Sequence, residues 1–351
     1  MSSDLAKYIK DIQLRNASTG RSWYWEKNAH RPRPFAYALE YNPVTLLLKT
    51  RRYIDRRRML APLMASNRPT GILRRPQDFR LLRDKIQSNS HQIQIDPTAV
   101  PSGFTQIDLS PSLPSGNRKL IIFHAFYEDE ANAIMDKLDQ FTDDDLMLTT
   151  PIPAIRDRFL ARFDPRRSAS FLVPNLGRDV LPFLSLLAFQ DLSNYQHFVK
   201  IHTKRSSHLS HGGKWFSANV EVLVGDHCMT DRIFELIDTR RPSIYGLESG
   251  PMTDHFRNNR RWLTYLLRDQ ARNLKARFIP GTMFAGSGEF LRQLAGLNLH
   301  LHRFEEEKGQ LDGCLVHALE RYFGHFAQTH GGECATFDSL VSRHSELIKP
   351  P

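Results

Sequence analysis

The sequence lacks both a long apolar segment and a dense set of cysteines. No run of eighteen apolar residues occurs among its 351 residues, which excludes a membrane-spanning helix within this sequence. The first residues, MSSDLAKYIKDIQ, have no apolar core of a secretory signal, so we expect a cytoplasmic protein. The three cysteines are far apart and form neither a disulfide framework nor a CxxC-type zinc pattern.

Positive charge is abundant only in the first third of the chain. Residues 1–117 contain 19 Lys and Arg against 9 Asp and Glu, whereas the remaining 234 residues contain 29 of each. No RNP, helix-turn-helix or zinc-finger pattern accompanies this excess, so we expect no nucleic-acid partner. A basic extension on a neutral domain instead favours electrostatic attachment.

Composition divides the chain into four parts. We expect a basic, mainly helical extension at 1–94, a Pro-, Ser- and Gly-rich linker at 95–117, a domain at 118–335 and a C-terminal tail at 336–351. Residues 44–64 mix leucines with arginines, as in a basic amphipathic helix that lies on the inner face of an anionic membrane. The alternative is a helix packed on the domain with a solvated arginine face.

After residue 118, short apolar runs alternate with helical patterns. The runs 119–124, 146–149, 169–173 and 197–202 indicate strands, and 128–141, 155–163 and 179–189 indicate helices. This alternation predicts an α/β, Rossmann-type fold whose mainly parallel sheet is flanked by helices. Ligands in such folds bind beyond the carboxyl ends of the strands. Residues that directly follow strands are therefore the candidates for a site.

The turn Pro174-Asn-Leu-Gly-Arg-Asp179 follows one strand and opens a helix. Backbone N–H groups at such a turn point at a bound ligand, and Gly177 permits a close approach. Asn175, Arg178 and Asp179 can hydrogen-bond a base, a ribose or a sugar. The alternative is an ordinary helix start with Asn175 as the N-cap.

A second basic segment, Lys200-Ile-His-Thr-Lys-Arg-Ser206, ends the strand 197–202. Lys200, His202, Lys204 and Arg205 concentrate positive charge at the carboxyl end of that strand. This suits a diphosphate, although a solvated loop would have the same composition.

Two later segments supply further candidates. Gly281 and Thr282, in the apolar run 278–284, can let the backbone approach a sugar ring; the alternative is a strand packed in the core. Asp312 precedes a helical pattern on which His317, Glu320 and Arg321 share one face. A carboxylate at this position can act as a general base for an acceptor hydroxyl, or it can cap the helix.

The triplet Asp143-Asp144-Asp145 is the nearest approach to a metal-binding Asp-x-Asp motif. It precedes its strand and so faces the other end of the sheet, and we interpret it as a surface turn. We therefore predict no metal site and no cofactor, although a divalent cation stays compatible with the sequence.

Taken together, IFHAFY, NLGRD, KIHTKRS, GTMF and DGCLVHALER resemble the rhamnan synthesis F family of bacterial polysaccharide glycosyltransferases, over about residues 118–335. This sequence departs from the family pattern at Leu176, Ala285 and Cys314, which stand where that pattern has Arg, Trp and Thr. The order of the blocks is similar to that of GT-A transferases.

The resemblance implies a nucleotide-sugar donor, carrying rhamnose or a related hexose, and a surface polysaccharide or lipopolysaccharide acceptor that is a glycan or is linked to lipid. It implies inverting transfer with Asp312 as base, helped by His317 and Glu320. The residues implied to bind the donor are Asn175, Gly177, Arg178, Asp179, His202, Lys204, Arg205, Gly281, Thr282 and Arg321. The alternative is a non-catalytic glycan-binding or polysaccharide-assembly protein on the same fold.

Overall fold

The computed structural model of the protein describes residues 2–17, 118–204, 212–251, 256–267, 276–295, 304–305 and 312–347. The predicted linker 95–117, the predicted amphipathic helix 44–64 and Arg205 lie outside these residues. Apart from the first residues of one helix, the described elements belong to a single compact unit. None of the helices in these ranges is both long enough and apolar enough to cross a membrane.

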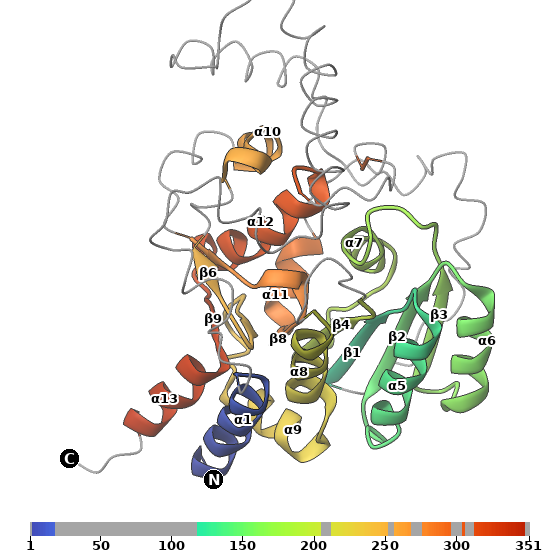
Figure 1. Ribbon diagram of the computed structural model, residues 1–351, viewed down its shortest axis with the longest axis horizontal. Helices are drawn as coiled ribbons and strands as arrows, with labels where there is room; N and C mark the ends of the chain where they lie inside the picture. The colour runs from blue at the N-terminus through green and yellow to red at the C-terminus, as the bar shows by residue number, and fades with distance from the viewer. Residues whose placement is uncertain are drawn as a thin grey trace, which may run out of the picture. The chain divides into compact units, whose positions relative to one another are not determined.

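A mixed seven-stranded sheet forms the centre of the structure, in the order β3-β2-β1-β4-β8-β5-β9 (Figure 1). Its strands are β1 (Lys119–His124), β2 (Asp145–Thr150), β3 (Ser168–Leu172), β4 (His197–His202), β5 (Ile244–Gly246), β8 (Phe284–Ser287) and β9 (Cys334–Thr336). Strands β1 to β4 pair in parallel, as does β5 with β9, but β8 runs antiparallel to both β4 and β5. The α/β prediction is confirmed, and the prediction of a mainly parallel sheet missed β8.

The antiparallel β8 has a local cause. A short 3-10 turn, Pro280–Thr282, separates it from β7 (Arg277–Phe278) and brings the chain back alongside β4. Strand β7 pairs with β6 (Gly250–Pro251) in a separate two-stranded ribbon. The turn therefore lies next to the end of β4, where the sequence predicts the site.

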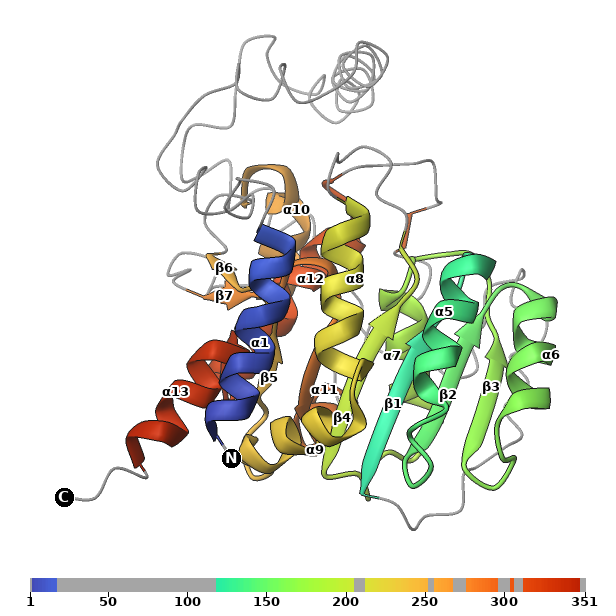
Figure 2. The ribbon, with the colours of Figure 1, turned by 60° about the horizontal axis from the view of Figure 1, so that its bottom comes forward.

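Helices cover both faces of the sheet (Figure 2). One face carries α1 (Ser2–Ala17), α5 (Glu128–Leu138), α6 (Pro153–Arg162), α8 (Gly212–Val224) and α9 (His227–Leu236). The other carries α7 (Val180–Phe189), α11 (Gly288–Ala295) and α12 (Leu315–Thr329), and α10 (Phe256–Leu267) packs on α12. The last helix, α13 (Phe337–Leu347), packs against α1 and α9.

The alternation of side chains along β4 assigns its residues to the two faces. Val199 and Ile201 belong to the apolar core beneath α1, α5 and α8. Phe198, on the opposite face, joins a cluster of five buried phenylalanines whose neighbouring ring centroids lie 5.8 to 6.4 Å apart; the others are Phe183, Phe284, Phe290 and Phe323. Lys200 and His202 follow Phe198 on that second face, so they too are buried.

Two segments outside the predicted domain 118–335 contribute to its core. Helix α1 comes from the predicted extension and α13 from the predicted tail. Their apolar residues are almost fully buried in the same cluster: Leu5, Ile9, Ile12, Phe337, Leu340 and Val341. Both helices are therefore part of the folded core of the domain.

The acidic triplet before β2 is not the surface turn that the sequence suggested. Asp143 is exposed, but Asp144 and Asp145 are each 1% exposed. Asp145 accepts a hydrogen bond of 2.7 Å from the Tyr195 hydroxyl. A buried carboxylate needs such partners because desolvation penalises its charge.

We predict that Ile9→Ala lowers the free energy of unfolding by about 2–5 kcal/mol, because it leaves a cavity between α1, α13 and the sheet. Chemical denaturation of the full chain measures the change. The exposed neighbour Lys10→Ala is the matched control and should leave stability within about 0.5 kcal/mol of the parent. Equal stability of both variants would show that α1 does not contribute to the core in solution.

Candidate functional site

The predicted site lies where β1 and β4 end side by side. Chain order reverses at this pair, because β2 and β3 lie on one side of β1 and β4 on the other. Crevices at such switch points are the usual ligand sites of open α/β sheets. The Thr203 hydroxyl accepts from the backbone N–H groups of Phe126 (2.8 Å) and Tyr127 (3.2 Å), which ties the two strand ends together.

A buried ion pair anchors this edge. The Lys200 ammonium donates to the Asp179 carboxylate at 2.6 Å, and the two side chains are only 2% and 11% exposed. The same ammonium donates to the carbonyl (3.0 Å) and hydroxyl (3.2 Å) of Thr282, whose hydroxyl donates to Asp179. Burial alone would raise the pKa of Asp179, but His202, Lys200 and these hydrogen bonds hold it well below its ordinary value.

Two tight turns flank the ion pair, and each has two consecutive residues in the left-handed backbone region. Gly177 (φ 64°) precedes Arg178 (φ 53°), and Gly281 (φ 77°) precedes Thr282 (φ 56°). A side chain at Gly177 would lie 2.4 Å from the Leu181 Cβ, and one at Gly281 would lie 2.2 Å from the Trp215 ring. Since Thr282 is β-branched, its positive φ is strained and persists only because its polar atoms are fully engaged.

The second turn is linked to helix α12. Glu320 accepts from the Gly281 N–H at 2.6 Å and pairs with Arg321 at 2.7 Å. Arg321 also donates to the His317 carbonyl at 2.6 Å and lies 3.9 Å from Asp312. Burial alone would raise the pKa of Glu320, but Arg321 and the Gly281 N–H lower it below its ordinary value. Four predicted site residues of the last block are thus connected to Gly281.

Asp312 is held ahead of α12 without capping it. The Asn259 amide donates to Asp312 Oδ1 at 2.8 Å and accepts from the Gly313 N–H at 3.2 Å. The N-cap is Cys314, and the first-turn N–H of Leu315 donates to Glu305. The Asp312 side chain is 24% exposed, so it is open to a solvent-borne group.

Two cations from different elements meet at this edge. Arg178 comes from the turn before α7 and Lys204 from the end of β4, and both are half-buried. Burial lowers the pKa of Lys204, and the charge of Arg178 lowers it further, against the opposite effect of Glu320 and Asp179. The Lys204 ammonium lies 4.7 Å from the centre of the Trp215 ring.

Burial lowers the pKa of the histidines of the site. The pKa of His317 falls to about 4, with a further contribution from Arg178, and that of His124 falls to about 3. Burial also lowers the pKa of His202, although its two ring nitrogens face the carbonyl oxygens of Gly281 at 2.7 Å and Thr203 at 3.1 Å. His202, predicted to add positive charge for a diphosphate, thus also ties the turn at Gly281 to the end of β4.

His317 contacts a donor at each ring nitrogen. Its Nδ1 faces the Cys314 N–H at 3.2 Å, and its Nε2 accepts from a guanidinium N–H of Arg178 at 3.1 Å. The imidazole therefore ties the turn before α7 to the start of α12.

The structure brings together most of the predicted site residues. Those joined by the contacts above are Arg178, Asp179, His202, Lys204, Gly281, Thr282, Asp312, His317, Glu320 and Arg321. Gly177 shapes the first turn, Asn175 is exposed beside it without capping α7, and Arg205 lies outside the described residues.

Sequence reasoning missed four contributors. Lys200 was part of the basic segment but was not among the donor-binding residues, and it belongs to the buried pair. His124 lies in the block IFHAFY but was given no role, and Trp215 and Asn259 lie in no recognised motif. The alternation of side chains between the two faces of the sheet could have identified His124, because it pairs in register with His202 and so lies on the same face.

A known protein family matches the part of the chain that contains this site. Residues 99–331 match the family described as rhamnan synthesis protein F. The chain belongs to this family. This match confirms the family resemblance drawn from the five sequence blocks.

Two curated relatives, both named uncharacterized protein WxcX, come from two strains of Xanthomonas campestris pv. campestris. Each is 31% identical over 228 residues, which cover 62% of this chain and 32% of the relative. The chain thus matches about a third of the length of these relatives. No solved structure matches the chain.

We predict that Lys200→Met lowers the free energy of unfolding by about 3–5 kcal/mol, because it leaves the Asp179 carboxylate buried without its counter-charge. Adding Asp179→Leu to this variant should restore part of the loss, since the orphaned charge is removed. Denaturant titrations of the two single variants and the double variant measure the coupling. Strictly additive losses would mean that the pair does not form.

We predict a second, pH-dependent effect from His317. Its folded-state pKa of about 4 lies below the ordinary value of 6.5, so between these values the unfolded chain binds more protons and stability falls as pH falls. From pH 7 to pH 5 this one residue lowers the free energy of unfolding by about 2 kcal/mol. His317→Gln should show a pH dependence shallower by that amount in denaturant titrations. An unchanged slope would contradict the neutral, buried state of His317.

Proposed function

We propose that this chain is a glycosyltransferase that moves a sugar, rhamnose or a related hexose, from a nucleotide-sugar donor to a growing surface polysaccharide or lipopolysaccharide. The observation that carries the proposal is the placement of two cations at the switch point of the sheet, Arg178 in contact with His317 at 3.1 Å and Lys204 just beyond the end of β4. Like charges held together disfavour each other, and an anionic ligand removes that cost. A GT-A-like arrangement agrees with the Rossmann-type sheet and with the order of the sequence blocks.

The donor diphosphate is the anion that we assign to these cations. In this proposal Lys204 and Arg178, with Arg205 beyond the described residues, balance the charge that builds up on the leaving diphosphate. His317 accepts from the Arg178 guanidinium at 3.1 Å and so orients it. Asp179 and Lys200 do not contact the ligand but hold the two turns, so they act as positioning residues.

The transfer step is an inverting displacement. The acceptor hydroxyl oxygen forms a bond to the anomeric carbon while the bond from that carbon to the diphosphate oxygen breaks. Asp312 takes the hydroxyl proton, and the nucleoside diphosphate leaves with both bonding electrons. Asn259 and Arg321 orient the Asp312 carboxylate for this role.

The family description supports polysaccharide synthesis, and the cluster of cations beside one partly exposed carboxylate supports group transfer more than mere binding. Peripheral contact of residues 44–64 with the cytoplasmic membrane is part of the same proposal, because it would hold the enzyme near a lipid-linked acceptor.

We predict that Asp312→Asn lowers kcat by about 10²–10⁴ and leaves nucleoside-diphosphate binding intact, because only the base is lost. Lys204→Ala should weaken diphosphate binding and lower kcat by about 10²–10³. A panel of nucleotide sugars with a glycan acceptor, tested with and without manganese, measures transfer. Thermal shifts with nucleoside diphosphates measure binding.

Asp238→Asn, which changes a carboxylate paired with the surface side chains of Arg240 and Arg241, is the control and should behave as the parent. Near-normal turnover in both site variants would reject the mechanism. Binding of nucleoside diphosphates without transfer from any donor would instead identify a non-catalytic glycan-assembly protein on this fold.

A further inference from the structure

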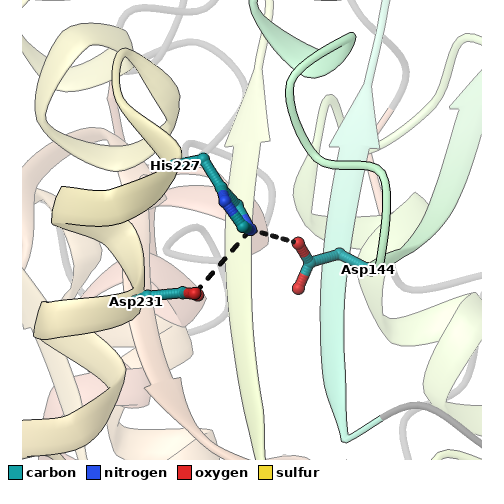
Figure 3. A group of neighbouring side chains, drawn as sticks. All are labelled: Asp144, His227 and Asp231. Atoms are coloured by element: carbon teal, nitrogen blue, oxygen red, sulfur yellow. Dashed lines mark hydrogen bonds and ion pairs between the residues drawn. The ribbon is translucent and has the colours of Figure 1, made fainter.

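A second cluster of ligand-type side chains lies at the opposite edge of the sheet. Asp144 directly precedes β2, and His227 and Asp231 lie one turn apart at the start of α9 (Figure 3). Strands β1 and β2 begin at this edge, whereas the candidate glycosyltransferase site lies where β1 and β4 end. The cluster is therefore independent of the function proposed above.

The three side chains offer one ligand atom each within a small volume. A single imidazole nitrogen, His227 Nε2, faces Asp144 Oδ2 at 3.1 Å and Asp231 Oδ2 at 3.8 Å, and all three ligand atoms lie within 4.8 Å of one another (Figure 3). Tetrahedral ligand atoms at about 2.0–2.2 Å from one zinc ion stand about 3.3–3.6 Å apart, so the spacing of His227 to Asp144 already suits the ion and Asp231 must move closer. Small rotations of the side chains are enough to close the site.

Asp144 provides an observation of its own. It is 1% exposed, and its second oxygen, Oδ1, is buried with no hydrogen-bond partner. Buried carboxylate oxygens are rarely left without a partner, and a bound cation is one common reason for an exception.

The surroundings hold the imidazole in place. Phe141 packs edge-on against the His227 ring, with the centroids 4.9 Å apart, and Gln140 accepts from the His227 backbone N–H at 2.9 Å. Asp226 caps α9 by accepting from the Met229 N–H at 3.1 Å. The His227 and Asp231 side chains are 26% and 31% exposed, so an ion can reach them from solvent.

We propose that Asp144, His227 and Asp231 bind a divalent transition-metal ion, with Zn²⁺ as the preferred ion and water completing its coordination. One nitrogen and two carboxylate oxygens form a ligand set typical of zinc. Mg²⁺ and Ca²⁺ prefer sites made only of oxygen, so the imidazole discriminates against them.

Lys119 is compatible with this site. Its ammonium pairs with Asp231 Oδ1, the oxygen that does not face His227. Asp231 would therefore bridge Lys119 and the ion, with one carboxylate oxygen on each. A partner such as Lys119, which does not bind the ion itself, helps to orient the ligand of a metal site. Bound Zn²⁺ would join the start of β2 to α9, two segments that are more than 80 residues apart in sequence.

The test uses the full chain, freed of metal with a chelator and titrated with ZnCl₂ by calorimetry, with melting temperature as a second readout. We expect one Zn²⁺ site that raises the melting temperature, whereas MgCl₂ gives no saturable binding. Asp144→Asn, His227→Gln and Asp231→Asn should each weaken this site at least about tenfold. The chain also carries 15 histidines and 3 cysteines, so only loss in these variants assigns the site.

Two controls separate this site from adventitious binding. Asp238→Asn removes a surface carboxylate after α9, and Cys228→Ser removes the exposed thiol next to His227; both should bind Zn²⁺ as the parent does. The three ligand replacements are close in size to the originals, and their metal-free melting temperatures report whether each folds. If all folded ligand variants bind Zn²⁺ as tightly as the parent, or if the parent binds none at micromolar concentrations, the proposal is wrong.

Discussion

The carboxyl edge of the sheet depends on one buried ion pair, Lys200 with Asp179. Neither charge is stable at that depth without the other, because transfer from water costs several kcal/mol per ion. The remaining capacity of the ammonium goes to the carbonyl and hydroxyl of Thr282. This fixes the turn at Gly281, whose N–H then points at Glu320 on α12. The position of α12, and of Asp312 ahead of it, follows from the pair.

Two residues with a strained backbone, Arg178 and Thr282, flank this ion pair. Arg178 and Thr282 both adopt positive φ values, each at a cost of roughly 1–3 kcal/mol for a residue other than glycine. Their neighbours Gly177 and Gly281 have no room for a side chain. Two strained turns at the same edge of the sheet are not needed merely to complete the fold. Backbone held so firmly suits a site in which donors must already point at the ligand when it arrives.

Apolar runs predicted β1 and β4 to the residue, because a buried strand needs little beyond a short continuous apolar sequence. The same rule failed at β8, because this strand has only four residues and pairs with strands that are far away in sequence. The motif blocks predicted which residues gather, but not which are buried. The sequence placed Lys200 at the start of a basic segment, and only its position on the Phe198 face of β4, in contact with Asp179, gives it a structural role. The packing of α1 against α13 is also non-local and left no pattern in either segment.

Buried carboxylates at the two edges of the sheet have different partners and opposite pKa shifts. Asp179 has a buried ammonium of its own, and its pKa falls below the ordinary value. Asp144 is as deeply buried, yet among the described residues its neighbours are an imidazole and a lysine whose hydrogen bond goes to Asp231, and its pKa rises. A buried carboxylate keeps its charge only where positive charge and hydrogen bonds offset its desolvation. The carboxyl edge supplies that charge from the chain, whereas a divalent cation at the amino edge would supply it from solution and add a tie between α9 and β2.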